Sequence, residues 1–116
     1  MEKLNVWIHC RVISDNDREL LTYQEKLLSK AANDLDMKIV GINKEVSRGK
    51  FLDSYGMREM KSSIKRGNVN IVLIYSKKRI SIYEDIYEEF EMFCDAHSVI
   101  VIALKDLEQW PLTDQF

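Results

Sequence analysis

The sequence predicts an α/β fold, a three-layer sandwich with a mostly parallel sheet of about four or five strands. Two apolar runs, Asn70–Tyr75 and Ser98–Leu104, are typical of strands that are buried on both faces of a parallel sheet. Segments with helical periodicity separate the apolar runs, and this alternation favours parallel strands joined by helices. The 116 residues contain 1 proline, so we expect one compact domain without disordered linkers.

The N-terminal part predicts a strand followed by a long helix. Apolar side chains alternate over residues 4–12, as in a strand, and the polar run Ser14–Asp17 then offers several helix N-caps. From about residue 18 to residue 35 the apolar period is helical. Gln24 falls on the inward stripe of this helix, so its amide needs a polar partner near the end of the first strand. The expected stripe comprises Leu20, Gln24, Leu27, Leu28, Ala31, Ala32 and Leu35.

The middle of the chain predicts a strand, a long loop, a helix and a second strand. Residues 37–43 form the expected strand, and residues 44–53, which lack an apolar period, form the loop. A short helix over residues 54–66 ends at Gly67, which stands where a C-cap glycine belongs. The strand over residues 70–75 is expected at the centre of the sheet.

The last third of the chain predicts a helix, a strand and a polar tail. Ser81-Ile82-Tyr83-Glu84 has the pattern of a capping box, which predicts the start of a helix that ends near Ala96. Residues 98–104 then form a fourth buried strand. From residue 105 onward we expect a polar tail with one weak helical turn before Pro111. The expected apolar stripe of the helix comprises Ile82, Ile86, Phe90 and Phe93.

Composition and motifs limit the functional classes. The formal net charge of -2 gives no general attraction to DNA, so contact with nucleic acid needs a local basic surface or another domain. No apolar run is long enough to span a membrane, and the N-terminus has no signal-peptide pattern, which favours a cytoplasmic protein. The sequence has no glycine-rich phosphate loop, dinucleotide fingerprint or nucleophile elbow, and we expect no cofactor.

Cysteine and histidine are too sparse to predict a metal site. Cys10 and Cys94 stand far apart in apolar segments, where free thiols behave as small hydrophobic groups. His9 falls within a strand and His97 at a helix end, without ligand spacing around either residue. We therefore expect buried structural cysteines and no metal.

A polar site is predicted at the end of the first strand. Arg11 ends the apolar alternation of that strand, and Ser14 follows it closely. The carboxyl ends of parallel strands are where open α/β sheets bind ligands, so this cation is a candidate for a phosphate site. Two simpler interpretations stay open, with Arg11 as a strand-end surface residue and Ser14 as a helix N-cap.

The same stretch resembles the opening of the serine recombinases, the resolvase and invertase family. The family pattern runs aromatic-x-Arg-Val-Ser-Thr and then, after a short loop, Leu-x-x-Gln. Arg11, Val12 and Gln24 match this pattern, whereas Ile13 stands in the place of the serine.

The resemblance continues along most of the chain. Residues 43–47 are similar to the family's Asp-x-x-x-Ser-Gly loop, and residues 54–57 fall where Arg-Pro-Gly-Leu is usual. Residues 78–82 fall on the family's Asp-Arg-Leu-Ser-Arg. The resemblance implies that residues 1–116 form a single resolvase-like catalytic domain, with no DNA-binding domain present.

The resemblance also implies a reaction, DNA strand exchange through a phosphoserine link. In the family a serine hydroxyl attacks a DNA phosphodiester while clustered arginines neutralise the phosphate. Ile13 has no nucleophilic atom, which leaves Ser14 as the candidate nucleophile. Because side chains alternate along a strand, Ser14 points away from Arg11 unless the chain bulges or turns between them.

Several cationic positions of the family are changed in this chain. Arg11 and Arg79 match family arginines. Ser54 and Ile82 stand where the family has cations, and Lys78 replaces an acid. Each lost charge contact costs about 10²- to 10³-fold in rate, so we expect an impaired catalytic site. The residues expected in that site are Ser14, Arg11, Arg79 and Gln24.

Two functions from different classes stay open. The first is a catalytically impaired resolvase-like domain of a site-specific serine recombinase, which reaches DNA through another domain or partner. The second is a non-catalytic dimerisation or partner-binding module that regulates a DNA recombination system. We expect a homo-oligomer, a homodimer in the simplest case. The residues expected to contact DNA phosphates are Lys77, Lys78 and Arg66.

Overall fold

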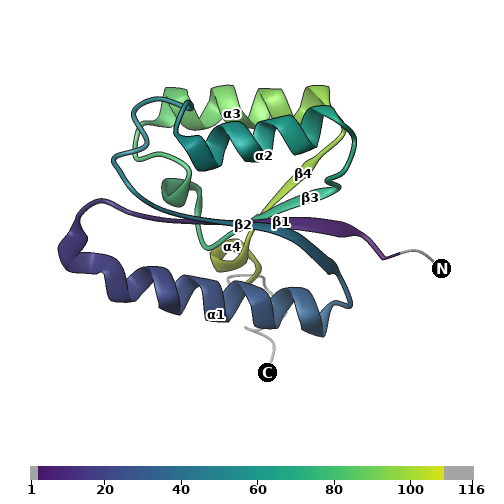
Figure 1. Cartoon of the computed structure of the whole chain (residues 1–116), viewed down its shortest axis with the longest axis horizontal. Coiled ribbons are helices and arrows are strands. Elements are labelled where there is room, and N and C mark those ends of the chain that lie inside the picture. Colours follow the sequence, from purple (N-terminus) through teal and green to yellow (C-terminus); the bar gives the residue numbers. More distant parts are fainter. Residues whose placement is uncertain (1–2, 109–116) are drawn as a thin grey trace.

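The computed structural model describes residues 3–108, and these form a three-layer α/β sandwich (Figure 1). The elements in chain order are β1 (Asn5–Val12), the 3₁₀ turn η1 (Asp15–Asp17), α1 (Arg18–Asp34), β2 (Lys38–Val46), α2 (Tyr55–Lys65), β3 (Ile71–Ile74), the 3₁₀ turn η2 (Lys77–Arg79), α3 (Glu84–Ala96), β4 (Ile100–Ala103) and α4 (Leu104–Glu108). Within this range the sheet has 4 strands, all parallel, in the order β2-β1-β3-β4. Helix α1 covers one face, and α2 and α3 cover the other. The predicted fold class is confirmed.

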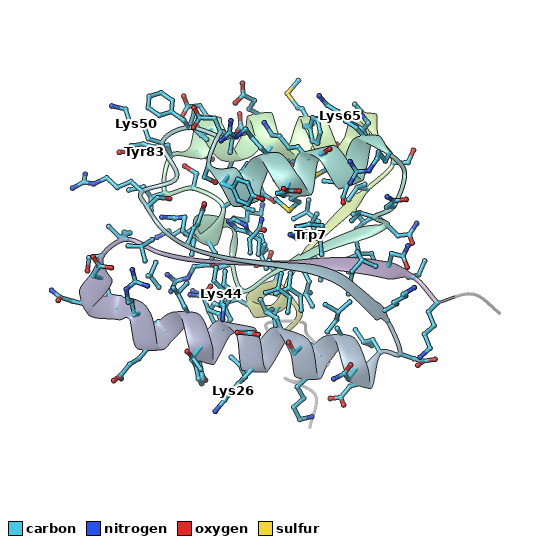
Figure 2. The ribbon with its side chains drawn as sticks, in the orientation of Figure 1. Trp7, Lys26, Lys44, Lys50, Lys65 and Tyr83 are labelled. Carbon is cyan, nitrogen blue, oxygen red and sulfur yellow. The ribbon has the colours of Figure 1, made fainter. Side chains whose placement is uncertain are left out.

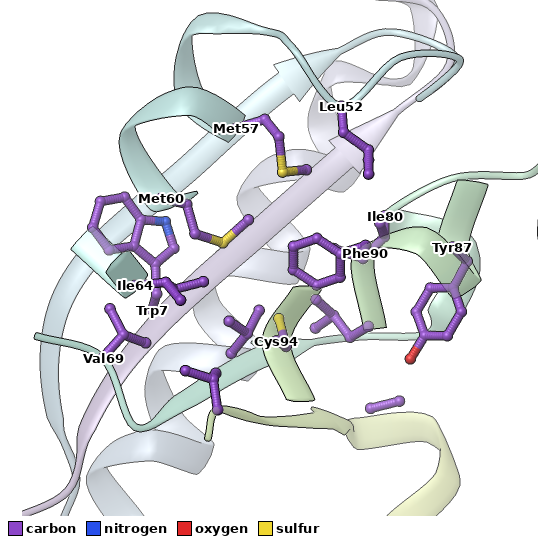
Figure 3. Close-up of a cluster of buried hydrophobic side chains, with 14 residues drawn as sticks. Trp7, Leu52, Met57, Met60, Ile64, Val69, Ile80, Tyr87, Phe90 and Cys94 are labelled. Carbon is purple, nitrogen blue, oxygen red and sulfur yellow. The ribbon is translucent and has the colours of Figure 1, made fainter. Parts of the chain in front are cut away.

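Strand β1 lies inside the sheet and divides its side chains between the two faces. Val6, Ile8, Cys10 and Val12 pack together on the α1 side. Trp7 points the other way, into the core beneath α2 and α3 (Figure 3). Because side chains alternate along a strand, the remaining odd-numbered residues of β1 also lie on the α2 side.

The strand order creates a switch point at the carboxyl ends of β1 and β3. From β1 the chain crosses to β2 on one side, and β3 and β4 form on the other side. The pairing of β1 with β2 continues to Val12, whereas the pairing of β1 with β3 ends at Ile8. The two inner strands therefore separate toward their carboxyl ends, which is where open α/β sheets bind ligands.

The core beneath α2 depends on one glycine of β2. The Trp7 indole lies over Gly41, where an added Cβ would meet the ring carbon Cζ3 at 2.4 Å. Glycine at this position lets β2 pass under the indole without displacing it. Met57 and Met60 of α2 and Phe90 of α3 fill the space above the sheet (Figure 3).

Several local predictions are confirmed. Helix α1 begins at Arg18, and α4 accounts for the predicted weak helical turn after β4. Gly67 follows α2 with a positive φ of 77°, the left-handed conformation that favours glycine after a helix. Cys10 and Cys94 are free and buried. The rest of the predicted polar tail, from residue 109, lies outside the described residues.

Two boundaries and a cap differ from the prediction. Strand β2 continues to Val46, because Lys44–Val46 pair with Cys10–Val12, so the predicted loop begins too early. Ser81 does not cap α3, since its hydroxyl accepts from the Tyr83 backbone N–H at 3.0 Å and forms a local turn. The N-cap of α3 is Tyr83, which makes no side-chain cap hydrogen bond.

The predicted buried faces are also partly wrong. Strand β4 is an edge strand rather than a buried one, and Ile100 is 62% exposed. Leu20 is exposed and its neighbour Leu21 is buried instead, and Leu35, directly after α1, is also exposed, whereas the predicted Gln24, Leu28 and Ala32 are buried. Ile82 is exposed and precedes α3 instead of belonging to its stripe. The buried residues of the two helices are Leu21, Gln24, Leu28 and Ala32 on α1, and Tyr87, Phe90 and Cys94 on α3.

Candidate functional site

Gln24 supplies the hydrogen bonds that a neighbouring strand would otherwise give to Arg11. The Arg11 backbone N–H donates to Gln24 Oε1 at 3.2 Å, and Gln24 Nε2 donates to the Arg11 carbonyl at 3.1 Å. The Val12 carbonyl accepts from Ser47 on the β2 side, so the Arg11 backbone faces the opposite side, where pairing with β3 has ended. The side-chain amide thus makes the two hydrogen bonds that the backbone of a neighbouring strand would make. The predicted need of Gln24 for a partner at the end of the first strand is confirmed.

The Arg11 side chain is buried and binds three backbone carbonyls. Its Nε donates to the Arg79 carbonyl at 3.0 Å, and its two terminal nitrogens donate to the carbonyls of Ser47 and Lys78. The guanidinium therefore connects the end of β1 with the loop after β2 and with η2. The interpretation of Arg11 as a surface residue is wrong, because 1% of the residue is exposed.

Burial and neighbouring charges act together on Arg11. Burial lowers the pKa of its guanidinium from the ordinary value. The Glu45 carboxylate opposes this shift in pKa, and the Arg79 cation adds to it. Glu45 is also the residue that pairs with Arg11 across β1 and β2. An acid therefore stands beside the buried cation and favours its charged form.

Arg79 lies in the same cluster. Its Nη1 donates to the Arg11 carbonyl at 3.2 Å, the same oxygen that accepts from Gln24. Its Nε is buried and has no hydrogen-bond partner among the described residues. The structure thus brings Arg11, Gln24 and Arg79 together at the switch point, as the sequence suggested. The hydrogen bonds among these three residues all involve backbone groups of Arg11 or of η2.

Ser14 belongs to the turn that follows β1. It occupies the N-cap position of η1, but its side chain makes no cap hydrogen bond. Its hydroxyl instead donates to the Asp17 carboxylate at 3.3 Å. Ile13, at the position that the resemblance gives to the nucleophile, is 46% exposed. The catalytic role of Ser14 stays a prediction.

The three residues expected to contact DNA phosphates do not share one surface. Lys77 and Lys78 are exposed on η2, at the carboxyl edge of the sheet. Arg66 follows α2 and bonds the Ser62 hydroxyl at 2.8 Å. The turn after α2 lies beside the start of β1, where the Asn5 side chain donates to a carbonyl of that turn. Arg66 therefore lies near the amino ends of the strands, away from Lys77 and Lys78, and its contact with DNA phosphates stays a prediction.

A buried polar group that the sequence did not predict lies next to Arg11. His9 is fully buried, and its Nδ1 lies 3.2 Å from Nδ2 of Asn43, its partner across β1 and β2. The Asn43 amide also donates to the Gly56 carbonyl at 2.9 Å. Because Asn43 Nδ2 is a donor, His9 Nδ1 accepts, and the ring proton is on Nε2. That nitrogen lies 3.5 Å from a carboxylate oxygen of Glu45.

His9 is held neutral by its surroundings. Burial lowers its pKa to about 3, and the nearby Arg11 cation acts in the same direction. A weak signal for this cluster was present in the sequence, since alternation places His9 on the same strand face as Arg11. Asn43 and Glu45 were assigned to a strand end and a loop, so their pairing with that face was missed.

A cavity of about 650 Å³ opens between β2 and the first turn of α2. Residues from β2 and from the start of α2 line it, with Trp7 contributing from β1. The lining includes the buried Asn43 and the acids Glu45 and Glu59. Figure 2 shows Trp7 on this side of the sheet and Lys44 on the α1 side. Among residues 3–108, no group of three or more His, Cys, Asp or Glu residues could hold a metal ion.

The fold is similar to that of several solved structures. The C-terminal catalytic domain of ISC1926 TnpA, an IS607-like serine recombinase, matches with a TM-score of 0.81 and 24% identity, covering 97% of this chain and 78% of that one. A resolvase family site-specific recombinase from Streptococcus pneumoniae matches with a TM-score of 0.75 and 21% identity, covering 97% and 82%. The N-terminal catalytic domain of TP901-1 integrase matches with a TM-score of 0.73 and 20% identity, covering 88% and 78%.

Sequence comparisons add nothing to this likeness. No protein-family profile matches the chain, and no curated protein matches it in sequence. Among the described residues, the helices are too short or too polar to cross a membrane. The similarity therefore rests on three-dimensional structure, and the chain has the fold of serine recombinase catalytic domains.

Proposed function

We propose that this chain is a resolvase-like domain of a DNA strand-exchange system and that it is impaired in DNA cleavage. One observation carries the proposal. The Arg11 guanidinium, at the switch point, donates to the backbone carbonyls of Ser47, Lys78 and Arg79. If the guanidinium turned toward a phosphate, the three carbonyls would lose their hydrogen-bond donor. Each buried carbonyl left unpaired would cost about 1–3 kcal/mol of free energy.

The candidate nucleophile and two other positions support impairment. In the proposed reaction, a serine Oγ forms a bond to phosphorus, the serine proton is removed, and the bond to the deoxyribose 3′ oxygen breaks. Ile13 cannot take part, and the Ser14 hydroxyl donates to the Asp17 carboxylate, whose negative charge repels a phosphate. Ser54 caps α2 through the Met57 N–H at 3.2 Å, so no cation stands at that position.

DNA contact is proposed for the carboxyl edge of the sheet, where Lys77 and Lys78 are exposed. Because the net charge of the chain is -2, we propose that another domain or partner supplies most of the affinity. We further propose a homodimer acting in the cytoplasm. The alternative function, a non-catalytic module that dimerises or binds a partner to regulate recombination, gains support from the same use of Arg11 within the fold.

Covalent trapping tests the impairment. Purified chain is incubated with nicked duplex DNA of mixed sequence, and protein-linked DNA is detected on a denaturing gel. We expect no adduct from the wild-type chain and none from Ser14→Ala. Ile13→Ser alone should also restore little, because Ser54 and Ile82 still leave the phosphate without two cations. An adduct that Ser14→Ala abolishes would contradict the proposal.

Duplex binding tests the DNA contact. We expect weak, salt-dependent binding of a duplex of about 30 base pairs, with Lys77→Ala/Lys78→Ala reducing the salt slope by about 1 to 2. The matched control is Lys65→Ala/Arg66→Ala, at the opposite edge of the sheet. Equal effects of the two double variants would contradict a contact through η2.

A further inference from the structure

The loop between β2 and α2, residues 47–54, is fixed from inside the molecule. Its first residue, Ser47, accepts a hydrogen bond from the Arg11 guanidinium. Gly49 has a positive φ of 70°, and an added Cβ would lie 2.5 Å from the Ile80 carbonyl oxygen. Leu52 is buried in the core beneath α2 and α3. The loop therefore has a defined position although it contains no helix or strand.

The outer side of this loop displays cations and aromatic rings. Arg48 and Lys50 are exposed, Phe51 is 66% exposed, and Tyr55 in the first turn of α2 is 73% exposed. Lys50 Nζ lies 5.6 Å from the centre of the Phe51 ring. Figure 2 shows Lys50 at this corner of the molecule. An exposed phenylalanine is common by itself, but two exposed rings and two exposed cations on one short stretch of the chain fit the pattern of a surface for single-stranded nucleic acid.

The cavity between β2 and α2 adjoins Tyr55 and offers room for a flat neutral group. Ser47, Ser54 and Tyr55 belong to its lining, together with Trp7 and the buried Asn43. The Glu59 carboxylate, one helical turn after Tyr55, raises the pKa of the Tyr55 hydroxyl. Glu59 and Glu45 also line the cavity, and the ammonium of Lys44, another lining residue, is paired with Glu25 of α1 at 2.9 Å. These acids disfavour a phosphate inside it, whereas a nucleobase carries no charge.

We propose that the corner formed by loop 47–54, Tyr55 and the adjoining cavity binds unpaired nucleotides of single-stranded DNA. Bases stack on Phe51 and Tyr55, one base enters the cavity, and the phosphates lie over Arg48 and Lys50. Stacking tolerates any sequence, because every base has a π face. The inference rests on the proposed function in taking DNA as the partner, since strands that are exchanged must first lose their pairing locally.

Fluorescence anisotropy with labelled oligo-dT of about 20 nucleotides tests the inference, with a duplex of equal length as the comparison. Base–aromatic stacking is strong enough that Phe51→Ala and Tyr55→Ala should each weaken oligo-dT binding about 10-fold. Tyr55→Phe keeps the ring and should stay within about 2-fold of wild type, since base stacking uses the ring and not the hydroxyl. Tyr23→Ala removes another exposed ring, on α1, and should leave binding unchanged. Duplex binding should be the same for all four variants.

Three results would overturn the inference. The first is no binding of oligo-dT at a wild-type protein concentration of about 100 μM. Stacking on the rings of Phe51 and Tyr55, aided by the charges of Arg48 and Lys50, should be detectable at that concentration. The second is an equal loss for Tyr23→Ala and Tyr55→Ala, which would indicate non-specific adhesion. The third is an equal loss on duplex and on oligo-dT. Duplex binding through Lys77 and Lys78 without oligo-dT binding would overturn this inference alone and leave the proposed function intact.

Discussion

The two faces of strand β1 are equally buried but differ in chemistry. On the α1 face, Val6 and Cys10 are apolar neighbours in a hydrophobic core, and both are fully buried. On the α2 face, His9 and Arg11 are as deeply buried, yet the side chain of each is hydrogen-bonded to specific polar groups. Burial alone therefore does not separate a structural face from a polar one. What separates them is whether a deleted side chain leaves only a cavity or leaves unpaired polar groups as well.

Replacing Arg11 should give the largest difference between the two faces. Arg11→Met removes the donors to three backbone carbonyls, so the free energy of unfolding should fall by about 3 to 5 kcal/mol. Ile8→Val, on the α1 face, removes one methyl group and should cost about 1 kcal/mol. Urea denaturation followed by circular dichroism measures both. Similar losses of unfolding free energy for the two variants would contradict this difference between the faces, because they would show that Arg11 contributes no stability through the three carbonyls.

Gln24 is a polar side chain on the otherwise apolar α1 face, so replacing it tests whether polar partners also matter there. Gln24→Ala leaves the Arg11 N–H and carbonyl without their amide partner, so the free energy of unfolding should fall by about 2 kcal/mol. Thr22→Ala, on the exposed side of the same helix, controls for helix propensity and should change it by less than about 0.5 kcal/mol. A loss for Gln24→Ala no greater than that of the control would exclude the strand-like role of the amide.

His9 should make the α2 face sensitive to pH. Its pKa is lowered to about 3 in the folded chain and returns to about 6.5 in the unfolded chain, which therefore binds the proton more readily. The stability contributed by neutral His9 is present above about pH 6.5 and declines as the pH falls toward 3. Between pH 6.5 and pH 5 the loss should be about 1.5 kcal/mol.

The control for this effect is His9→Gln, which cannot titrate. Unfolding free energies of both proteins across the same pH range separate the contribution of His9 from that of every other titratable group. Parallel curves for His9→Gln and the wild-type chain would mean that His9 does not account for the pH dependence.

The sequence predicted the apolar face of β1 and the location of the polar site because both signals are local. Alternation over the first strand identifies the α1 face, and the position of Arg11 at the strand end identifies the ligand-binding end of the sheet. Gln24 was predictable for a related reason, since a polar residue on an apolar helix stripe requires a partner. These inferences need no knowledge of strand register.

The partners on the α2 face could not be predicted, because they depend on register and on backbone atoms. His9 meets Asn43 through a register that shifts by one residue between Val6 and Trp7. The carbonyls that hold Arg11 belong to Ser47, Lys78 and Arg79, and a carbonyl is present at every residue of a chain. The burial of Arg11 and its use within the fold thus required the three-dimensional structure.

A crystal structure grown with sulfate or phosphate tests the central claim most directly, because it reveals what the Arg11 guanidinium binds when an anion is available. We predict that Arg11 stays on the carbonyls of Ser47, Lys78 and Arg79, and that the Ser14 hydroxyl stays on Asp17. An anion held jointly by the guanidiniums of Arg11 and Arg79, within hydrogen-bond distance of the Ser14 hydroxyl, would contradict the account and indicate a working phosphate centre.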